Sequence, residues 1–278
     1  MLLKETYPID LPTSTTPIRV FITEPSLPSH PTARFPAVIV WSEIYQVTGP
    51  VARFASQIAA HGYIVACPSV YHEFEGPEPL AYDVKGTDRG NELKVKKELR
   101  AYDEDARVVV DWLGGLERCT GRIGTTGMCL GGHLAFRTAF DKRVTAAVCF
   151  FPTDIHSSTL GTIPAGDTVT KDSLTLVRSG ALSHAELLIL LGKQDTHIPR
   201  AGRDLIRATL EDANVVVTWC EFHHAQHAYI RDTSSKGRYD AVLTGLCFQQ
   251  MLEVFYRTLV IDLGGGERVA AKAPVHVC

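Results

Sequence analysis

The stretch RIGTTGMCLGGHLA, from Arg122 to Ala135, joins a strand-like run to a helix-like run through a glycine-flanked cysteine. Cys129 stands in the pattern Gly-x-Cys-x-Gly, with a second glycine directly behind it. In such a motif the nucleophile occupies a sharp strand-to-helix turn, and the turn points N–H groups at the thiol. A packed thiol in a glycine-rich turn fits the same letters, so the motif alone leaves both interpretations open.

Short runs rich in Val and Ile lie on both sides of this motif. Apolar and polar residues do not alternate strictly in these runs, which is typical of strands covered on both faces. The runs span 35–43, 62–70, 122–127, 144–151, 187–195 and 215–222, and helical patterns occupy 50–61, 99–114, 131–140, 199–212 and 237–260. This alternation predicts an α/β fold in which helices cover both faces of a mostly parallel central sheet.

The chain is long enough for one large core. Its 278 residues are 45% hydrophobic and 21% charged, and without an internal repeat or linker we expect a single domain over 1–262. The stretch LGGGERVAAKAPVHVC follows the last helical pattern with a glycine triplet, which predicts a loose tail over 263–278. The polar segment 71–98 interrupts the rhythm of strands and helices, and it is either a lid or a packed loop.

Charge and cysteine usage narrow the class of protein. The net charge is −3 without a block of basic residues, so nucleic acid is not an expected partner. Lys4 and Glu5 stand where a signal peptide needs apolar residues, and no apolar run is long enough to span a membrane. The seven cysteines form no CxxC pair, a reduced pattern that predicts a cytoplasmic protein.

Two later segments provide partners for Cys129. Asp195 follows the apolar run LLILLGKQ, and His227 follows the run VVVTWCEF. The order nucleophile, acid, histidine is that of hydrolase triads, and each residue falls at the carboxyl end of a predicted strand. Taken singly, Asp195 is also explained as a helix N-cap, and His227 as a loop histidine.

The segment HHAQHAYIRD also raises the question of a metal. His223 and His227 are four residues apart and His224 lies between them, but no acidic or cysteine partner stands at the usual spacing. We therefore expect neither a metal nor another cofactor.

The stretches GMCLGGHLA, LGKQDTHIP, AQHAYIRD and VIVWSEIYQ together resemble the dienelactone hydrolase (carboxymethylenebutenolidase-like) family of the α/β-hydrolase superfamily. The resemblance covers roughly 20–255 and implies the α/β-hydrolase fold. It implies that Cys129 is the nucleophile, His227 the base and Asp195 its orienting acid. It also implies that Glu43 interacts with the cysteine and that the N–H groups of Ile44 and Leu130 form the oxyanion hole.

The implied substrate contacts agree less well with this family. Arg231 falls where the family carries an arginine for a substrate carboxylate, although a solvated loop arginine fits as well. A second such arginine is replaced by Glu73, whose charge requires a nearby cation, Arg89 or Lys85. Side chains expected to line a differently charged pocket are His72, Glu73, Tyr82, Asp83 and Arg89, with a solvated loop as the alternative.

The sequence thus predicts a hydrolase that cleaves a small-molecule ester or lactone through Cys129, Asp195 and His227, as a monomer or homodimer without a membrane or nucleic-acid partner. Three alternatives remain open. The first is a broader carboxylesterase or thioesterase. The second is a non-catalytic scaffold that binds small molecules, and the third is a thiol redox sensor.

Overall fold

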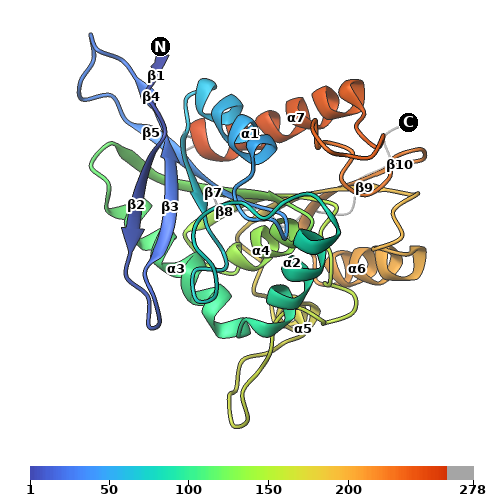
Figure 1. Cartoon of the computed structure of the whole chain (residues 1–278). Helices are drawn as coiled ribbons and strands as arrows, with labels where there is room; N and C mark the ends of the chain where they lie inside the picture. Colours follow the sequence, from blue (N-terminus) through green and yellow to red (C-terminus); the bar gives the residue numbers. More distant parts are fainter. Residues whose placement is uncertain (262–278) are drawn as a thin grey trace, which may run out of the picture.

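The computed structural model describes residues 1–261, in which an eight-stranded sheet lies between two layers of helices (Figure 1). The strand order is β10-β9-β8-β7-β5-β6-β3-β2. The strands are β2 (Tyr7–Leu11), β3 (Ile18–Thr23), β5 (Phe35–Trp41), β6 (Ile64–Pro68), β7 (Cys119–Met128), β8 (Val144–Phe150), β9 (Glu186–Gly192) and β10 (Val216–Phe222). The six neighbouring strands β10, β9, β8, β7, β5 and β6 are all parallel, which confirms the predicted α/β sheet.

The central strands are buried on both faces. Val38, Ile39 and Val40 of β5 have no exposed surface, so consecutive side chains all contact helices. This explains the continuous apolar runs of the sequence. At the sheet edge, β2 alternates exposed and half-buried residues and pairs antiparallel with β3. A separate two-stranded antiparallel sheet consists of β1 (Leu2–Leu3) and β4 (Pro25–Ser26).

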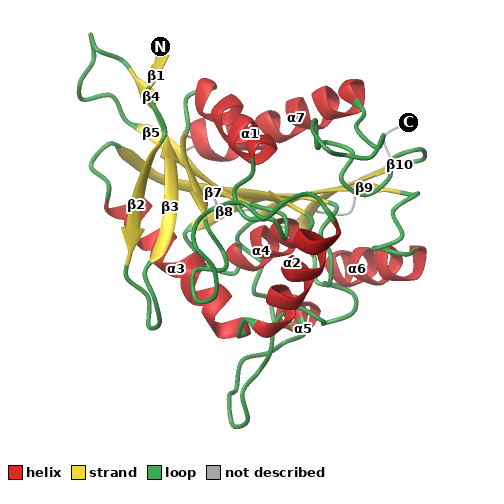
Figure 2. Ribbon diagram, in the orientation of Figure 1, coloured by secondary structure: helices red, strands yellow, loops and turns green. Residues whose placement is uncertain are grey.

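The helices form a layer on each face of the sheet (Figure 2). One layer holds α1 (Gly49–Ala60) and α7 (Ala241–Phe255), and a π-helical turn, Tyr256–Val260, continues α7. The opposite layer holds α2 (Val84–Lys96), α3 (Leu99–Gly115), α4 (Leu130–Thr138), α5 (Ser173–Arg178) and α6 (Arg200–Asp212). No helix within residues 1–261 is long and apolar enough to cross a membrane. The predicted tail, 263–278, lies outside the described residues.

The polar segment 71–98 contains a helix that the pattern of apolar residues did not reveal. Helix α2 buries Leu93 together with two glycines, Gly86 and Gly90. A Cβ on Gly90 would lie 2.4 Å from the carbonyl oxygen of Ile44, so the helix packs through its backbone. The buried hydroxyl of Tyr71 donates to the Gly90 carbonyl at 3.1 Å. These contacts make α2 a packed wall above the carboxyl ends of the strands.

Candidate active site

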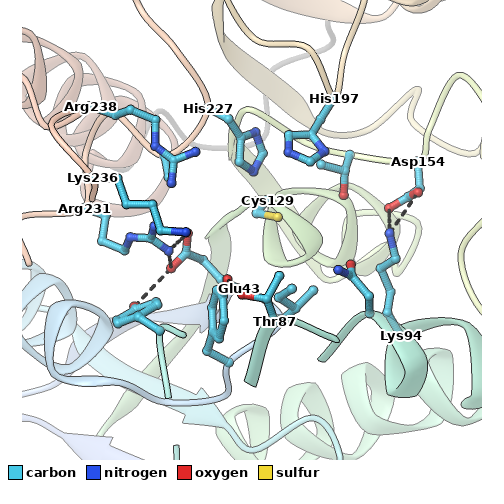
Figure 3. A pocket seen from close by; sticks show the side chains of 16 residues that line it. Glu43, Thr87, Lys94, Cys129, Asp154, His197, His227, Arg231, Lys236 and Arg238 are labelled. Carbon is cyan, nitrogen blue, oxygen red and sulfur yellow. Dashed lines mark hydrogen bonds and ion pairs between the residues drawn. The ribbon is translucent and has the colours of Figure 1, made fainter. Parts of the chain in front are cut away.

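A pocket of about 210 Å³ opens at the carboxyl ends of β5, β7, β8 and β9, where the strand order changes direction (Figure 3). This is the position at which open α/β sheets bind their ligands. The residues that line it are Glu43, Ile44, Tyr45, Tyr82, Thr87, Asn91, Lys94, Cys129, Thr153, Asp154, His197, His227, Ala228, Arg231, Lys236 and Arg238.

Cys129 occupies the turn between β7 and α4. Its φ of 59° and ψ of −120° are a strained conformation for a residue with a side chain. The flanking glycines permit this turn, because a Cβ on Gly131 would lie 2.1 Å from the Trp41 carbonyl oxygen and one on Gly127 2.2 Å from the Gly131 carbonyl oxygen. The half-buried thiol lines the pocket at the start of α4.

His227 and Asp195 meet beside the thiol. His227 Nδ1 lies 2.7 Å from Asp195 Oδ2, and the N–H of His197 donates to Asp195 Oδ1 at 2.8 Å. Burial of Asp195 favours its protonated form, but the bonds and charge of His227 together with the His197 N–H outweigh burial and lower the pKa of Asp195. Asp195 is therefore a carboxylate that fixes the orientation of the imidazole.

The environment of His227 favours its protonated form. Burial alone lowers the pKa of this imidazole, but its interactions with Cys129 and with the Asp195 carboxylate outweigh burial and raise the pKa to about 10. The ring of His197 packs on His227 with 4.4 Å between centroids. Burial and the His227 charge lower the pKa of His197, so this second ring remains neutral.

Glu43 lies across the pocket from the two histidines (Figure 3). Arg231 Nη1 lies 3.3 Å from each carboxylate oxygen, and the Tyr82 hydroxyl donates to Oε2 at 3.1 Å. The Arg231 guanidinium also stacks over the Tyr82 ring, 4.3 Å from its centroid. The structure thus brings Glu43, Tyr82 and Arg231 together in one cluster, in which Arg231 is paired with Glu43.

The two amides expected to form the oxyanion hole belong to Ile44 and Leu130. Ile44 lines the pocket directly after Glu43. Leu130 is the first residue of α4, so its N–H has no carbonyl partner within the helix. Both positions are compatible with donors to an oxygen near the sulfur.

Four of the five side chains expected to line a differently charged pocket lie elsewhere, and Asp83 is the N-cap of α2. Glu73 pairs with Lys97 at 2.7 Å, within a buried cluster that also contains His72 and Asp105. Arg89 pairs with Glu75 at 2.5 Å on the outer side of α2. The predicted lining is therefore wrong at four positions: His72, Glu73, Asp83 and Arg89. Glu73 and Arg89 each form an ion pair with another residue of the polar segment 71–98.

The other histidines of the HHAQH segment serve elsewhere. His224 Nε2 lies 3.0 Å from Asp240, the N-cap of α7, and the His223 carbonyl accepts a bond from Gln194. Within residues 1–261 no group of three or more His, Cys, Asp or Glu side chains is arranged to hold a metal ion.

One wall of the pocket is formed by residues that were not predicted from the sequence. Thr87, Asn91 and Lys94 of α2 face the site, and their spacing of four and three residues is the available signal in the sequence. Lys94 forms an ion pair with Asp154 at 3.0 Å at one side of the pocket (Figure 3). The further missed lining residues are Tyr45, Thr153, Asp154, His197, Ala228, Lys236 and Arg238.

Comparison with known proteins shows the family of the chain. Residues 19–259 match the Dienelactone hydrolase family. The chain belongs to the dienelactone hydrolase family. A Saccharomyces cerevisiae protein provisionally named a carboxymethylenebutenolidase is 51% identical over 281 residues, which is all of both chains. The carboxymethylenebutenolidase of Pseudomonas putida is 25% identical and covers 72% of this chain and 77% of its own.

Solved structures agree with the fold. A crystal structure from Klebsiella pneumoniae, provisionally described as a dienelactone hydrolase, superposes with a TM-score of 0.74 at 19% identity. It covers 92% of this chain and 100% of its own. The chain is thus a hydrolase of the dienelactone hydrolase type, with the α/β-hydrolase fold predicted from its sequence.

Proposed function

We propose that this chain hydrolyses a small carboxylic ester or lactone, of the enol-lactone kind for which the family is named, through a Cys129–His227–Asp195 triad. The observation that carries the proposal is the 2.7 Å contact between His227 and Asp195 in the pocket that contains Cys129 on its strained turn. A buried thiol without catalytic use needs neither the turn nor a carboxylate-oriented imidazole.

The first half-reaction forms an acyl-enzyme. The Cys129 sulfur attacks the carbonyl carbon, an S–C bond forms, and the carbonyl electron pair moves to the oxygen. The N–H groups of Ile44 and Leu130 stabilise this oxyanion. The carbonyl then re-forms, the C–O bond to the leaving group breaks, and His227 Nε2 gives its proton to the departing alkoxide.

The second half-reaction uses the same imidazole as a base. Acylation removes the negative sulfur, which is a main cause of the raised pKa of His227. Burial then favours the neutral ring, so His227 accepts a proton from water while the hydroxide attacks the thioester. The S–C bond breaks, the acid leaves, and the thiolate regains its imidazolium partner.

Glu43 has a supporting role in this proposal. Its oxygens are engaged by Arg231 and Tyr82, whereas His227 is the group coupled to the sulfur. In this proposal Glu43 contributes a negative charge to the pocket wall facing Cys129. His227 transfers the protons in both half-reactions.

The test combines labelling of the thiol with hydrolysis. Iodoacetamide should add one label at Cys129, and hydrolysis of p-nitrophenyl acetate should fall in proportion to labelling. Cys129→Ala and His227→Ala should each abolish turnover while circular dichroism stays unchanged. Cys220→Ala is the matched control, because Cys220 is a half-buried free thiol outside the pocket.

Near-normal turnover by Cys129→Ala would reject the nucleophile. Labelling of Cys129 without any hydrolysis of p-nitrophenyl esters, acyl thioesters or enol lactones would instead favour a redox sensor or a binding scaffold.

A further inference from the structure

One side of the pocket is lined by an ion pair that the proposed reaction does not use. Lys94 Nζ, on α2, lies 3.2 Å from Asp154 Oδ1 and 3.0 Å from Oδ2. The two side chains are only 16% and 11% exposed, and both residues line the pocket. They lie on the opposite side of Cys129 from Glu43 and Arg231 (Figure 3). A substrate group on this side of the sulfur therefore contacts the pair.

The segments that carry the two charges are held in place. Asp154 follows β8 with a positive φ of 65°, and residues in this region of backbone conformation cluster at functional sites. The Thr159 hydroxyl donates to Asp154 Oδ1 at 2.6 Å, and the Ser158 N–H donates to the Asp154 carbonyl at 3.0 Å. The Tyr102 hydroxyl donates to the Lys94 carbonyl at 3.2 Å. The pair is thus supported by contacts with residues outside the pocket lining.

The pair retains unused hydrogen-bonding capacity. A lysine ammonium has three N–H donors, and each carboxylate oxygen accepts about two bonds. Within residues 1–261, the Lys94 ammonium donates only to the two Asp154 oxygens, and Asp154 Oδ2 accepts from Lys94 alone. One donor and one acceptor, on atoms 3.0 Å apart, therefore remain for a substrate group.

Thr153 adds a third polar group at the same place. It precedes Asp154, lines the pocket and is only 6% exposed. Its hydroxyl is buried, and no residue within 1–261 forms a hydrogen bond with it. An unpaired buried hydroxyl costs free energy, so its position in a pocket lining points to a polar group that binds there.

A neutral hydroxyl group fits these partners best. Its oxygen donates one bond and accepts two, so it donates to Asp154 while it accepts from Lys94. A carboxylate would be repelled by Asp154 and an ammonium by Lys94, because the charges of the pair cancel. A carbonyl oxygen brings no donor, so Asp154 would lose contact with water and gain no bond in return.

We propose that Lys94, Thr153 and Asp154 form a subsite for a hydroxyl group of the substrate. This inference rests on the proposed function, and it names hydroxylated esters and lactones as the class of substrate. Since the subsite and Arg231 lie on opposite sides of Cys129, the hydroxyl is recognised apart from the Arg231 cluster (Figure 3).

The first test compares two esters that differ by one hydroxyl. p-Nitrophenyl 3-hydroxybutyrate and p-nitrophenyl 3-methylbutyrate have the same leaving group, and a methyl group of the second replaces the hydroxyl of the first. Asp154→Asn keeps the size of the side chain, and Thr153→Val keeps its shape. The ratio of kcat/KM for the hydroxy ester to kcat/KM for the methyl ester should fall about tenfold in Asp154→Asn and about threefold in Thr153→Val.

Thr145→Val is the matched control. Thr145 also has a buried hydroxyl without a partner among residues 1–261, but it lies at the start of β8 and outside the pocket lining. The control should leave the ratio unchanged. An unchanged ratio in both subsite variants, or an equal loss for the two esters, would overturn the subsite. Thr153→Val replaces an unpaired hydroxyl by a methyl group, so it keeps the test valid if Asp154→Asn does not fold.

The second test does not need ester hydrolysis. N-(2-hydroxyethyl)iodoacetamide and N-propyliodoacetamide differ by a hydroxyl in place of a methyl group, and the Cys129 sulfur displaces iodide from both. The ratio of their rates at Cys129 should fall about threefold or more in Asp154→Asn and stay constant in Thr145→Val. If no ester is hydrolysed but this ratio falls, the proposed function fails while the subsite stands. If both esters are hydrolysed but neither ratio changes, the subsite fails while the proposed function stands.

Discussion

His227 Nδ1 lies 2.7 Å from Asp195 Oδ2, although the two residues are 32 positions apart. They come from the loops that follow β10 and β9, which are neighbouring parallel strands. Parallel strands end at the same edge of a sheet, so residues far apart in the chain converge there. The contact therefore depends on the register of the sheet as well as on the two side chains.

Asp195→Asn should separate orientation from folding. The amide keeps the size of the side chain but loses the charge that helps to raise the pKa of His227. We expect kcat/KM for p-nitrophenyl acetate to fall about 100-fold or more, with an unchanged circular dichroism spectrum. Asp204→Asn, on the exposed face of α6, is the matched control. Activity within about twofold of the wild type would exclude Asp195 from the triad.

Lys94→Met should alter the acid stability of the protein. Burial favours protonated Asp154, but Lys94 and the Thr159 hydroxyl outweigh burial and lower the pKa of Asp154 to about 2. Because this folded-state pKa lies below that of an unfolded aspartate, the stabilisation is present above about pH 4 and is lost as the pH falls through about 2.

The variant should therefore lose about 2 kcal/mol of unfolding free energy at pH 7, measured by urea denaturation, and the difference from the wild type should shrink toward pH 2. Lys85→Met removes an exposed lysine from the same helix and should have little effect. A difference that stays constant from pH 7 to pH 2 would contradict the assignment.

Gly90→Ala should disturb the loop after β5. The new Cβ would lie 2.4 Å from the Ile44 carbonyl oxygen, and backbone atoms yield only by moving the loop. We expect a loss of about 1–3 kcal/mol in stability and a lower kcat, because the Ile44 N–H is a proposed oxyanion donor. Gly114→Ala, where nothing lies within 4 Å, should be neutral or stabilising. Equal behaviour of the two variants would argue against close packing of α2.

Glu73→Gln tests where that carboxylate acts. Lys97 is fully buried and binds both Glu73 and Asp105, so one lost charge should reduce stability by about 1 kcal/mol or more. KM for charged and neutral esters should stay the same, since Glu73 lies outside the pocket lining. Glu92→Gln, in an exposed pair with Arg89, is the control. A changed KM with unchanged stability would return Glu73 to the substrate site.

Much of the sheet could be predicted from the sequence because the central strands are buried on both faces. The run 35–43 corresponds to β5 (Phe35–Trp41), and 187–195 to β9 (Glu186–Gly192). Apolar patterning does not identify α2, because this helix packs through glycines and has no apolar stripe. The antiparallel edge strands β2 and β3 were also outside the prediction.

For the site, the order of elements was enough to place Cys129, Asp195 and His227 in one region. Pairing of charges was not predictable in the same way. The excursion 71–98 contains acids and bases at many spacings, and only the fold decides that Glu73 meets Lys97 while Arg89 meets Glu75. Lys236 and Arg238 were missed because a left-handed turn, rather than a strand end, brings them to the pocket.

Helix α2 supplies a wall of the pocket that carries none of the residues proposed to do the chemistry. Thr87, Asn91 and Lys94 contribute its pocket face, whereas the proposed nucleophile and the proposed base come from loops after strands. Mutations on that face change the shape and polarity of the wall without touching the turn at Cys129. Adaptation to new esters therefore has a short path through three side chains, and a library randomised at those codons is the natural starting point for redirecting the enzyme.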